Sequence, residues 1–303
     1  MKKYSLLLII CFTNYLSAQI GDFNHYPALQ PQHILDEKLN NISFAFSLRL
    51  LESNYIGPLI RLRRASDNAE QDFYCRADDK VDISAIDTWR AGSNVYVTVW
   101  YDQSGLNRHA TQTTINRQPR FYPDNTTPYF QGDGINDYLV VDTPNGIQDV
   151  TTNGSVASIL TIFKATQKRQ YGFGVEAGSN RWSAHTNWID NRFYFDPGRC
   201  CSSSNSRSFN NTANINVWAN YTLIKANQSI LMRVNNIQRI NTNHNRPRCT
   251  LTLDFAIGWG NNTNNNSSLY STNSFLEFIM YRTSISSVFY DAIEESQTTF
   301  WQL

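Results

Sequence analysis

The sequence has little net charge and few charged side chains for its length. Its 303 residues include 17% Asp, Glu, Lys and Arg, and the formal net charge is +1. No long-range electrostatic field therefore favours nucleic acid or an anionic membrane surface as a partner. Aromatic residues make up 13%, and we interpret this balance as that of an extracellular β protein whose polar surface carries amides and hydroxyls.

Several common kinds of functional site are missing. The five histidines are scattered, so no Ser–His–Asp array can be recognised. No Cys and His residues have the spacing of a zinc site, and there is no glycine-rich phosphate-binding loop. Neither an internal repeat nor a linker rich in Pro, Gly or Ser divides the chain. We therefore expect one domain over residues 19–303.

Long apolar segments are also absent, apart from a short one at the N-terminus. Lys2 and Lys3 precede the apolar residues 6–12, and small residues precede Gln19. This pattern predicts a signal peptide over residues 1–18 and a secreted protein, either extracellular or periplasmic. The apolar run is too short to span a membrane, and no run of about 18 apolar residues follows it.

Four cysteines remain in the predicted mature chain, namely Cys75, Cys200, Cys201 and Cys249. Export permits disulfides, and four cysteines allow three pairings. Adjacent Cys200 and Cys201 can bond to each other, or they can bond one each to Cys75 and Cys249. Free thiols are the third alternative.

Most of the chain shows the pattern of β-strands. Residues 95–100 alternate between two faces and then run into the turn residues 102–105. From Val156 onward, short apolar runs alternate with turn residues, at residues 159–164, 171–175, 191–195, 218–225, 230–234, 251–258 and 275–281. Helix-like spacing occurs at residues 82–90 and 284–301. The sequence thus predicts an all-β jelly-roll sandwich of the concanavalin/laminin-G type with a short C-terminal helix.

An ordered set of short motifs resembles a known family. The motifs are Ala45-Phe-Ser-Leu-Arg-Leu-Leu, Tyr55-Ile-Gly-Pro-Leu, Arg64-Ala-Ser-Asp, Gln71-Asp, Tyr101-Asp-Gln-Ser-Gly and Asn107-Arg-His-Ala-Thr. They are similar to the catalytic domain of family 54 α-L-arabinofuranosidases, the arabinofuranosidase B type, over residues 43–140. The resemblance implies a concanavalin-like sandwich that removes arabinofuranosyl side groups with retention of configuration. The same block also resembles exported laminin-G-like domains.

The catalytic carboxylates of that family do not have clear counterparts. A retaining glycosidase needs two carboxyl groups about 5 Å apart. The family's acid/base Asp follows an Ile-Gly-Gly motif, where this sequence has Gly260 or Asn261. The family's nucleophilic Glu follows a Cys-Cys pair, and no Glu occurs in the corresponding strand here. The candidates that remain for an enzyme are Glu176, Asp190 and Asp196.

A sugar-binding site is expected in the second half of the chain. Aromatic faces pack on sugar rings while polar groups bind the ring edge. The candidate ligand-binding residues are Trp182, His185, Trp188, Tyr194, Trp259 and Asn261. The expected ligand is a polysaccharide or oligosaccharide, including those that contain arabinose.

Other carboxylates have structural interpretations. Asp133 and Asp137 lie in a Gly-Asp-Gly-Ile-Asn-Asp turn, where their oxygens could bind calcium; no other cofactor is expected. Asp102 is expected to cap backbone N–H groups of its turn, and Glu277 to form hydrogen bonds within the sheet.

Three functions are consistent with the sequence. The leading hypothesis is a secreted carbohydrate-binding sandwich, because the expected catalytic Glu and Asp are missing. The alternative is an active α-L-arabinofuranosidase with relocated carboxylates, which the ordered motifs favour. The third is a laminin-G-like protein-adhesion module. Two close carboxylates in a groove would favour the enzyme. An aromatic groove without such a pair would favour the binding module, and a flat face poor in aromatics would favour the adhesion module.

Overall fold

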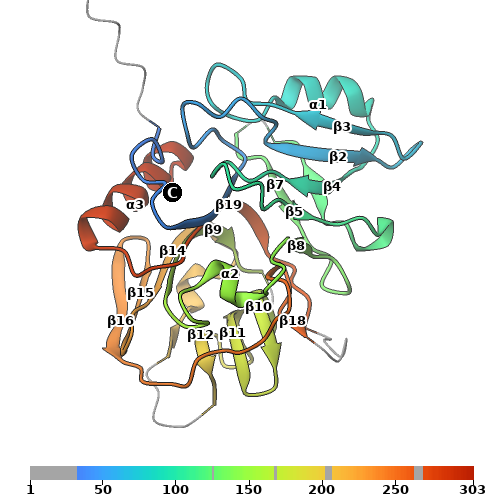
Figure 1. The fold of residues 1–303 in the computed structure, drawn as a ribbon. Coiled ribbons are helices and arrows are strands. Elements are labelled where there is room, and N and C mark those ends of the chain that lie inside the picture. Colours follow the sequence, from blue (N-terminus) through green and yellow to red (C-terminus); the bar gives the residue numbers. More distant parts are fainter. Residues whose placement is uncertain (1–32, 125, 167–168, 202–206, 263–268) are drawn as a thin grey trace, which may run out of the picture. The chain divides into compact units, whose positions relative to one another are not determined.

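Antiparallel strands are the main secondary structure of the computed structural model, which describes residues 33–124, 126–166, 169–201, 207–262 and 269–303 (Figure 1). The predicted signal peptide lies outside the described residues. Residues 33–303 pack as one unit. No described helix has the length and apolar character needed to cross a membrane.

The first part of the sheet is built by the N-terminal half of the chain. Its strands are β2 (Ile60–Arg64), β3 (Glu70–Phe73), β4 (Val95–Trp100), β5 (Ala110–Thr111), β6 (Arg120–Tyr122), β7 (Tyr129–Gln131) and β8 (Leu139–Val141). The strands pair in the order β3-β2-β4-β6-β7, and β5 joins β4 to β8. The alternation predicted for residues 95–100 holds at the start of β4, where Val95 and Val97 are buried and Tyr96 is half-buried, but not at its end, where Val99 is half-buried and Trp100 is fully buried.

Two further groups of strands form the layers of the sandwich. One contains β1 (Ile42–Ser47), β9 (Ala157–Lys164), β14 (Ala219–Lys225), β15 (Ser229–Val234), β16 (Ile237–Asn243) and β19 (Ser274–Tyr281). The other contains β10 (Gln170–Ala177), β11 (Asn180–Asn187), β12 (Arg192–Arg199), β13 (Ser208–Asn210), β17 (Ala256–Ile257) and β18 (Asn261–Asn262). The first group pairs in the order β16-β15-β14-β9-β19-β1, and the second in the order β17-β10-β11-β12-β13. Strand β18 pairs in parallel with β10.

The helices and turns have local sequence causes. Helix α1 (Ile83–Arg90) begins after Asp82, whose carboxylate accepts the N–H of Ala85 at 3.0 Å. Helix α2 (Ile147–Val150) is one turn long, and the 3₁₀ turns η2 (Ile115–Arg117) and η3 (Thr212–Asn214) are shorter still. Asn235 and Asn236 both have positive φ and form the tight β15–β16 hairpin that the sequence predicts.

The closing helix, α3 (Ser287–Trp301), packs against β9 and β14. It confirms the C-terminal helix predicted from the apolar stripe. Residues 251–258, predicted as a strand, are an exception: the segment is irregular and pairs only at Ala256–Ile257. An apolar run therefore identifies burial here but not sheet pairing.

Aromatic side chains dominate the interior. The buried side chains of Phe44, Phe46, Trp100 and Phe130 are in ring contact, each with the next, at centroid distances of 4.8 to 5.3 Å.

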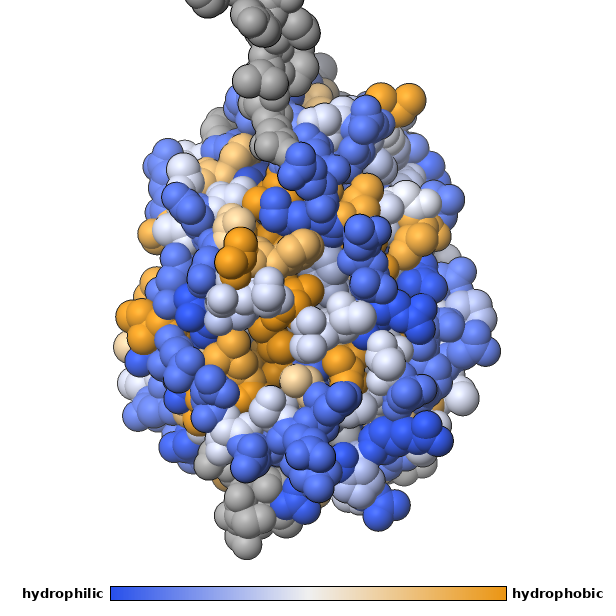
Figure 2. Space-filling view, turned by 60° about the vertical axis from the view of Figure 1, so that its left-hand side comes forward, coloured by the Kyte–Doolittle hydropathy of each residue, from blue (hydrophilic) through white to orange (hydrophobic). Residues whose placement is uncertain are grey.

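On the outside, Figure 2 shows a band of hydrophobic residues between mostly hydrophilic areas on one face. The all-β sandwich with a short C-terminal helix is the fold that the sequence predicts.

Candidate functional site

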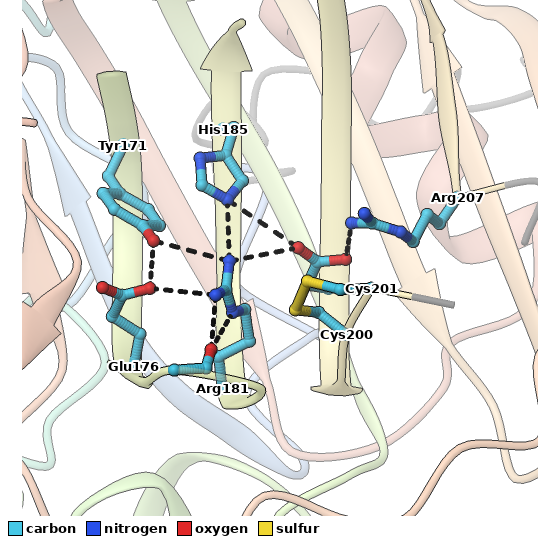
Figure 3. The surroundings of a disulfide bond; sticks show 9 residues. Tyr171, Glu176, Arg181, His185, Cys200, Cys201 and Arg207 are labelled. Atoms are coloured by element: carbon cyan, nitrogen blue, oxygen red, sulfur yellow. Dashed lines mark hydrogen bonds and ion pairs between the residues drawn. A yellow bond between two sulfur atoms is a disulfide. The ribbon is translucent and has the colours of Figure 1, made fainter. Parts of the chain in front are cut away.

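A pocket of about 290 Å³ opens over the strands β10, β11 and β12 (Figure 3). We call it the Arg181 pocket. Its lining consists of Tyr171, Arg181, His185, Trp188, Tyr194, Asp196, Cys201 and Arg207. Glu176 lies beside the lining and contacts both Tyr171 and Arg181.

Strand register brings these side chains together. Glu176 on β10 pairs with Arg181 on β11, and Asp196 on β12 pairs with Ser183 on β11. Side chains two residues apart on a strand share a face, so Arg181 and His185 point the same way. Figure 3 shows both projecting from the middle strand between the side chains of the outer two.

Arg181 lies between two carboxylates that come from different strands. Its Nη2 is 3.4 Å from Oε2 of Glu176, and its Nη1 is 3.8 Å from Oδ2 of Asp196. The guanidinium also donates to the carbonyl oxygen of Gly178 and to the hydroxyl of Tyr171. Because this planar cation is held by several partners, it fixes the positions of both carboxylates.

Asp196 is the more buried of the two acids, with 1% of its surface exposed. Burial raises the pKa of its carboxyl, and the neighbouring Arg207 and Arg181 oppose that shift. Arg207 donates to Oδ1, whereas Oδ2 has no hydrogen-bond partner among the described residues. A ligand hydroxyl would satisfy this oxygen.

His185 is electrically neutral in this pocket. Burial, followed by the charges of Arg181 and Arg207, holds the pKa of His185 well below its ordinary value. Its Nε2 is 3.1 Å from Nη1 of Arg181, so Nε2 accepts a hydrogen bond. His185 therefore positions Arg181 and carries no proton to donate from that nitrogen.

Aromatic rings form the rest of the wall. Trp188 meets the ring of His185 edge-on, with centroids 4.5 Å apart, and the guanidinium of Arg207 lies 4.8 Å from the ring of Tyr194. The hydroxyl of Tyr171 donates to Glu176, and burial raises the pKa of this phenol. A Cβ at Gly260 would lie 2.9 Å from the Tyr171 ring, so glycine is needed at that position.

The disulfide at the pocket joins adjacent residues, Cys200 and Cys201. Of the alternatives that the sequence leaves open, this is the vicinal bond. Cys75 and Cys249 are free thiols, so the alternative in which they bond to Cys200 and Cys201 does not occur. Cys249 is buried, which raises the pKa of its thiol to about 11 and leaves it unreactive.

Other predicted ligand-binding residues lie elsewhere. Trp182 is fully buried and donates its indole N–H to the carbonyl of Ser155, because it occupies the opposite strand face from Arg181. Trp259 is only 3% exposed and stacks on Tyr270. These two tryptophans therefore do not offer a ring face to a sugar, and the prediction for them is wrong.

Two more candidates lie outside the pocket lining. Asn261 donates its side-chain amide to the carbonyl of Asp254 at 2.8 Å. Asp190 lies in the turn before β12, where it accepts the N–H of Arg192 and the hydroxyl of Tyr194. Asp190 thus orients a pocket residue, and neither side chain lines the pocket itself.

The remaining carboxylates have mostly structural contacts. Asp102 caps its turn by accepting backbone N–H groups, and Glu277 is fully buried with hydrogen bonds across the sheet, so both predictions are confirmed. Oδ1 of Asp133 accepts the N–H groups of Ile135 and Asn136. No three His, Cys, Asp or Glu side chains gather at a metal-binding distance within the described part of the chain. Calcium at Asp133 and Asp137 stays a prediction.

Sequence reasoning missed Tyr171, Arg181 and Arg207. Strand alternation could have found Arg181, which lies four residues before His185 on one face. Tyr171 could not be found this way, because the register shifts between Tyr171 and Phe173. This bulge places Tyr171 opposite His185 on the pocket face, although it has the same parity as Phe173, which packs in the core.

Comparison with known proteins places the resemblance in the first half of the chain. The family described as alpha-L-arabinofuranosidase B, catalytic, matches residues 42–128. An alpha-L-arabinofuranosidase B from Penicillium canescens is 38% identical over 65 residues, which are 21% of this chain and 14% of that protein. An alpha-L-arabinofuranosidase from Hypocrea jecorina is 38% identical over 64 residues, 21% of this chain and 13% of that protein. The resemblance to the arabinofuranosidase B catalytic domain is thereby confirmed.

Solved structures extend the likeness to most of the fold. An arabinofuranosidase complexed with arabinofuranosyl-α-1,2-xylobiose superposes with a TM-score of 0.67 at 16% identity, covering 86% of this chain and 62% of that one. A family 54 α-L-arabinofuranosidase soaked with a cyclic sulfate inhibitor gives a TM-score of 0.54 at 15% identity, covering 86% and 63%. This chain thus spans less than two thirds of each relative. The Arg181 pocket lies beyond the residues that the family matches.

Proposed function

We propose that this protein is a glycoside hydrolase of the arabinofuranosidase type, acting on arabinofuranosyl side groups in the Arg181 pocket. The observation that carries the proposal is the pair of carboxylates, Glu176 and Asp196, held on either side of Arg181 in an aromatic-lined pocket. Glycosidases use two carboxyl groups that flank the scissile bond. The likeness to arabinofuranosidases supports the choice of sugar.

The two acids have different surroundings, which suits different roles. Glu176 forms an ion pair with Arg181 and accepts the Tyr171 hydroxyl, contacts that hold its carboxylate in place for the role of nucleophile or base. Asp196 is buried and its pKa is raised, as expected of a general acid. Trp188 and Tyr194 supply ring faces for the sugar.

Arabinose release from arabinan and arabinoxylan tests this function. We expect release by the wild-type protein and a loss of about a hundredfold or more in both Glu176→Gln and Asp196→Asn. Glu295→Gln is the matched control, because Glu295 is an exposed carboxylate on α3. Full activity in both pocket variants would show that these carboxylates are not catalytic. The family resemblance implies retention, which NMR of the first anomer released would measure.

A second function, sugar binding without hydrolysis, is favoured by one observation. Oδ1 of the deeply buried Asp196 is already bound by Arg207, which restricts its part in proton transfer. A binding module would retain arabinoxylan without releasing arabinose, and Trp188→Ala would weaken retention. The aromatic lining speaks against the third hypothesis, a protein-adhesion face.

We also infer that the protein is secreted. The basic and apolar pattern of residues 1–18 supports export, and the Cys200–Cys201 disulfide suits an oxidising compartment. N-terminal sequencing of the exported protein should find Gln19 first. A mature protein that still begins at Met1 would contradict this inference.

A further inference from the structure

A larger cavity, of about 640 Å³, lies on the N-terminal half of the sheet. We call it the Arg63 cavity. It is lined by Arg63, Ala65, Asn68, Tyr96, Asn116, Arg120, Tyr122, Gln131 and Asp137, among others. None of these residues lines the Arg181 pocket. Its volume lies within the range of ligand-binding clefts.

A row of directly paired residues forms one wall of this cavity. Arg63 on β2 pairs with Tyr96 on β4, Tyr96 pairs with Arg120 on β6, and Arg120 pairs with Gln131 on β7. Directly opposite residues share a face and lie about 5 Å apart in successive strands. Four strands therefore present two cations, an aromatic ring and an amide to the same space.

Both arginines are held in place by neutral groups. The guanidinium of Arg63 lies 4.9 Å from the Tyr96 ring and donates to Gln118 at 2.6 Å and to Asn68 at 2.9 Å. The guanidinium of Arg120 lies 4.8 Å from the Tyr122 ring. Such cation–π contacts orient the guanidinium and leave N–H donors at its edge.

One carboxylate adjoins this row: Glu70 on β3 lies directly opposite Arg63 on β2, is exposed, and accepts the hydroxyl of Thr98. Within the described residues, the side-chain hydrogen bonds of Arg63 and Arg120 go to the amide oxygens of Gln118, Asn68 and Asn94 and not to a carboxylate, and Arg63 is only 5% exposed. A buried charge without a partner is costly, so a bound anion would be stabilising here. A carboxylate matches the fork of N–H donors of a guanidinium better than a point charge does.

The cavity also has an acidic end, formed by Asp133 and Asp137. The carboxylate of Asp133 accepts N–H groups of its own turn. Burial, followed by the charge of Asp133, raises the pKa of Asp137 to about 7, so the neutral form is populated near neutral pH. Asp137 and the side chain of Asn116 can then form hydrogen bonds with ligand hydroxyls.

We propose that the Arg63 cavity is a second carbohydrate site that binds an acidic saccharide, with a uronic-acid carboxylate on Arg63 and Arg120 and a sugar ring against Tyr96 or Tyr122. Paired arginines recognise the acid, ring faces recognise the sugar, and amides recognise its hydroxyls. The site would hold an acidic part of a polysaccharide independently of any reaction in the Arg181 pocket.

Isothermal titration of the purified protein with trigalacturonate tests the proposal, with neutral xylotriose as the comparison ligand. We expect trigalacturonate to bind at least about tenfold more tightly, and Arg120→Gln to weaken it by about tenfold or more. Arg120 is exposed, so this substitution should not disturb folding. Arg239→Gln on β16 removes the same charge from an exposed strand elsewhere and should have no effect.

Other results would overturn the proposal. Equal affinity for xylotriose would remove the acid preference, and an equal loss in Arg239→Gln would indicate nonspecific charge attraction. Inorganic phosphate or a glutamate-rich peptide binding as tightly, with the same dependence on Arg120, would exclude a saccharide site. Weakening by Trp188→Ala would move the ligand to the Arg181 pocket. Glu176→Gln should leave trigalacturonate binding unchanged, so this test is separate from that of the hydrolase activity.

Discussion

Arg49 and Glu277, 228 residues apart in the sequence, form a buried ion pair with Nε and Oε2 2.8 Å apart. The Glu277 carboxylate also accepts hydrogen bonds from Gln297 and Trp301 on α3. The hydroxyl of Ser47 on β1 donates to it as well, so one carboxylate links β1, β19 and the C-terminal helix. Removing one partner leaves a buried charge uncompensated, which destabilises the folded protein.

We expect Glu277→Gln to lower the free energy of unfolding by about 3 kcal/mol, because Arg49 would remain buried without a counterion. Urea unfolding measures the change. Asp78→Asn is the matched control, since its ion pair with Arg76 is exposed and should contribute less than about 1 kcal/mol. Equal effects of the two substitutions would contradict the role given to burial.

The turn after β4 depends on Asp102. Its carboxylate accepts the N–H groups of Ala45, Ser104 and Arg108 at 2.8 to 3.0 Å. Asp102→Ala should reduce stability by about 3 kcal/mol or more, because these donors would lose their partner in a buried site. Asp142→Ala, at an exposed position, should change the urea midpoint very little. If Asp102→Ala left the stability unchanged, water would be replacing the carboxylate as the acceptor of these N–H groups.

Asp137 should make stability fall as the pH rises. Its folded-state pKa of about 7 lies above the ordinary 3.8, so the unfolded chain releases the proton first. Stability is therefore lost between about pH 4 and pH 7, by a few kcal/mol at most. Asp137→Asn should remove this loss. The Tm of the variant should therefore rise relative to that of the wild type as the pH increases from 4.5 to 8. A constant difference across that range would refute the shift.

The disulfide should matter to the Arg181 pocket more than to overall stability. Cys200 and Cys201 are adjacent and close no loop, so the bond restricts the unfolded chain very little. We expect reduction to lower the free energy of unfolding by no more than about 1 kcal/mol, yet to weaken arabinoxylan retention, because Cys201 lines the pocket. The double variant Cys200→Ser and Cys201→Ser should be insensitive to reductant. A large stability loss on reduction would contradict this expectation.

Arg181 should set the pH dependence of the proposed reaction. Burial raises the pKa of Asp196, and Arg181 holds part of that shift back. Arg181→Gln should raise this pKa further, which moves the alkaline limb of the kcat/KM profile to higher pH if Asp196 is the acid. If kcat/KM decreased by the same factor at every pH, without a shift of the alkaline limb, Arg181 would act only by positioning the carboxylates.

Much of the fold can be predicted from local sequence patterns. The strand at residues 95–100, the helix after Asp82 and the apolar stripe of α3 are all recognisable without a structure, because alternation and capping depend on near neighbours. The structural roles of Asp102 and Glu277 followed from the same local reasoning. For the pocket, the sequence pointed to the correct segment, and to His185, Trp188, Tyr194 and Asp196 within it.

The sequence by itself determined the all-β class, the C-terminal helix and the family resemblance of the first half. Only the tertiary structure decided that Trp182 points inward, that Cys200 bonds to Cys201, and that Arg181 separates Glu176 from Asp196. The physical reason is strand register. Alternation tells which residues share a face, but bulges and turn lengths decide which residue lies opposite which, and these are settled when the layers pack.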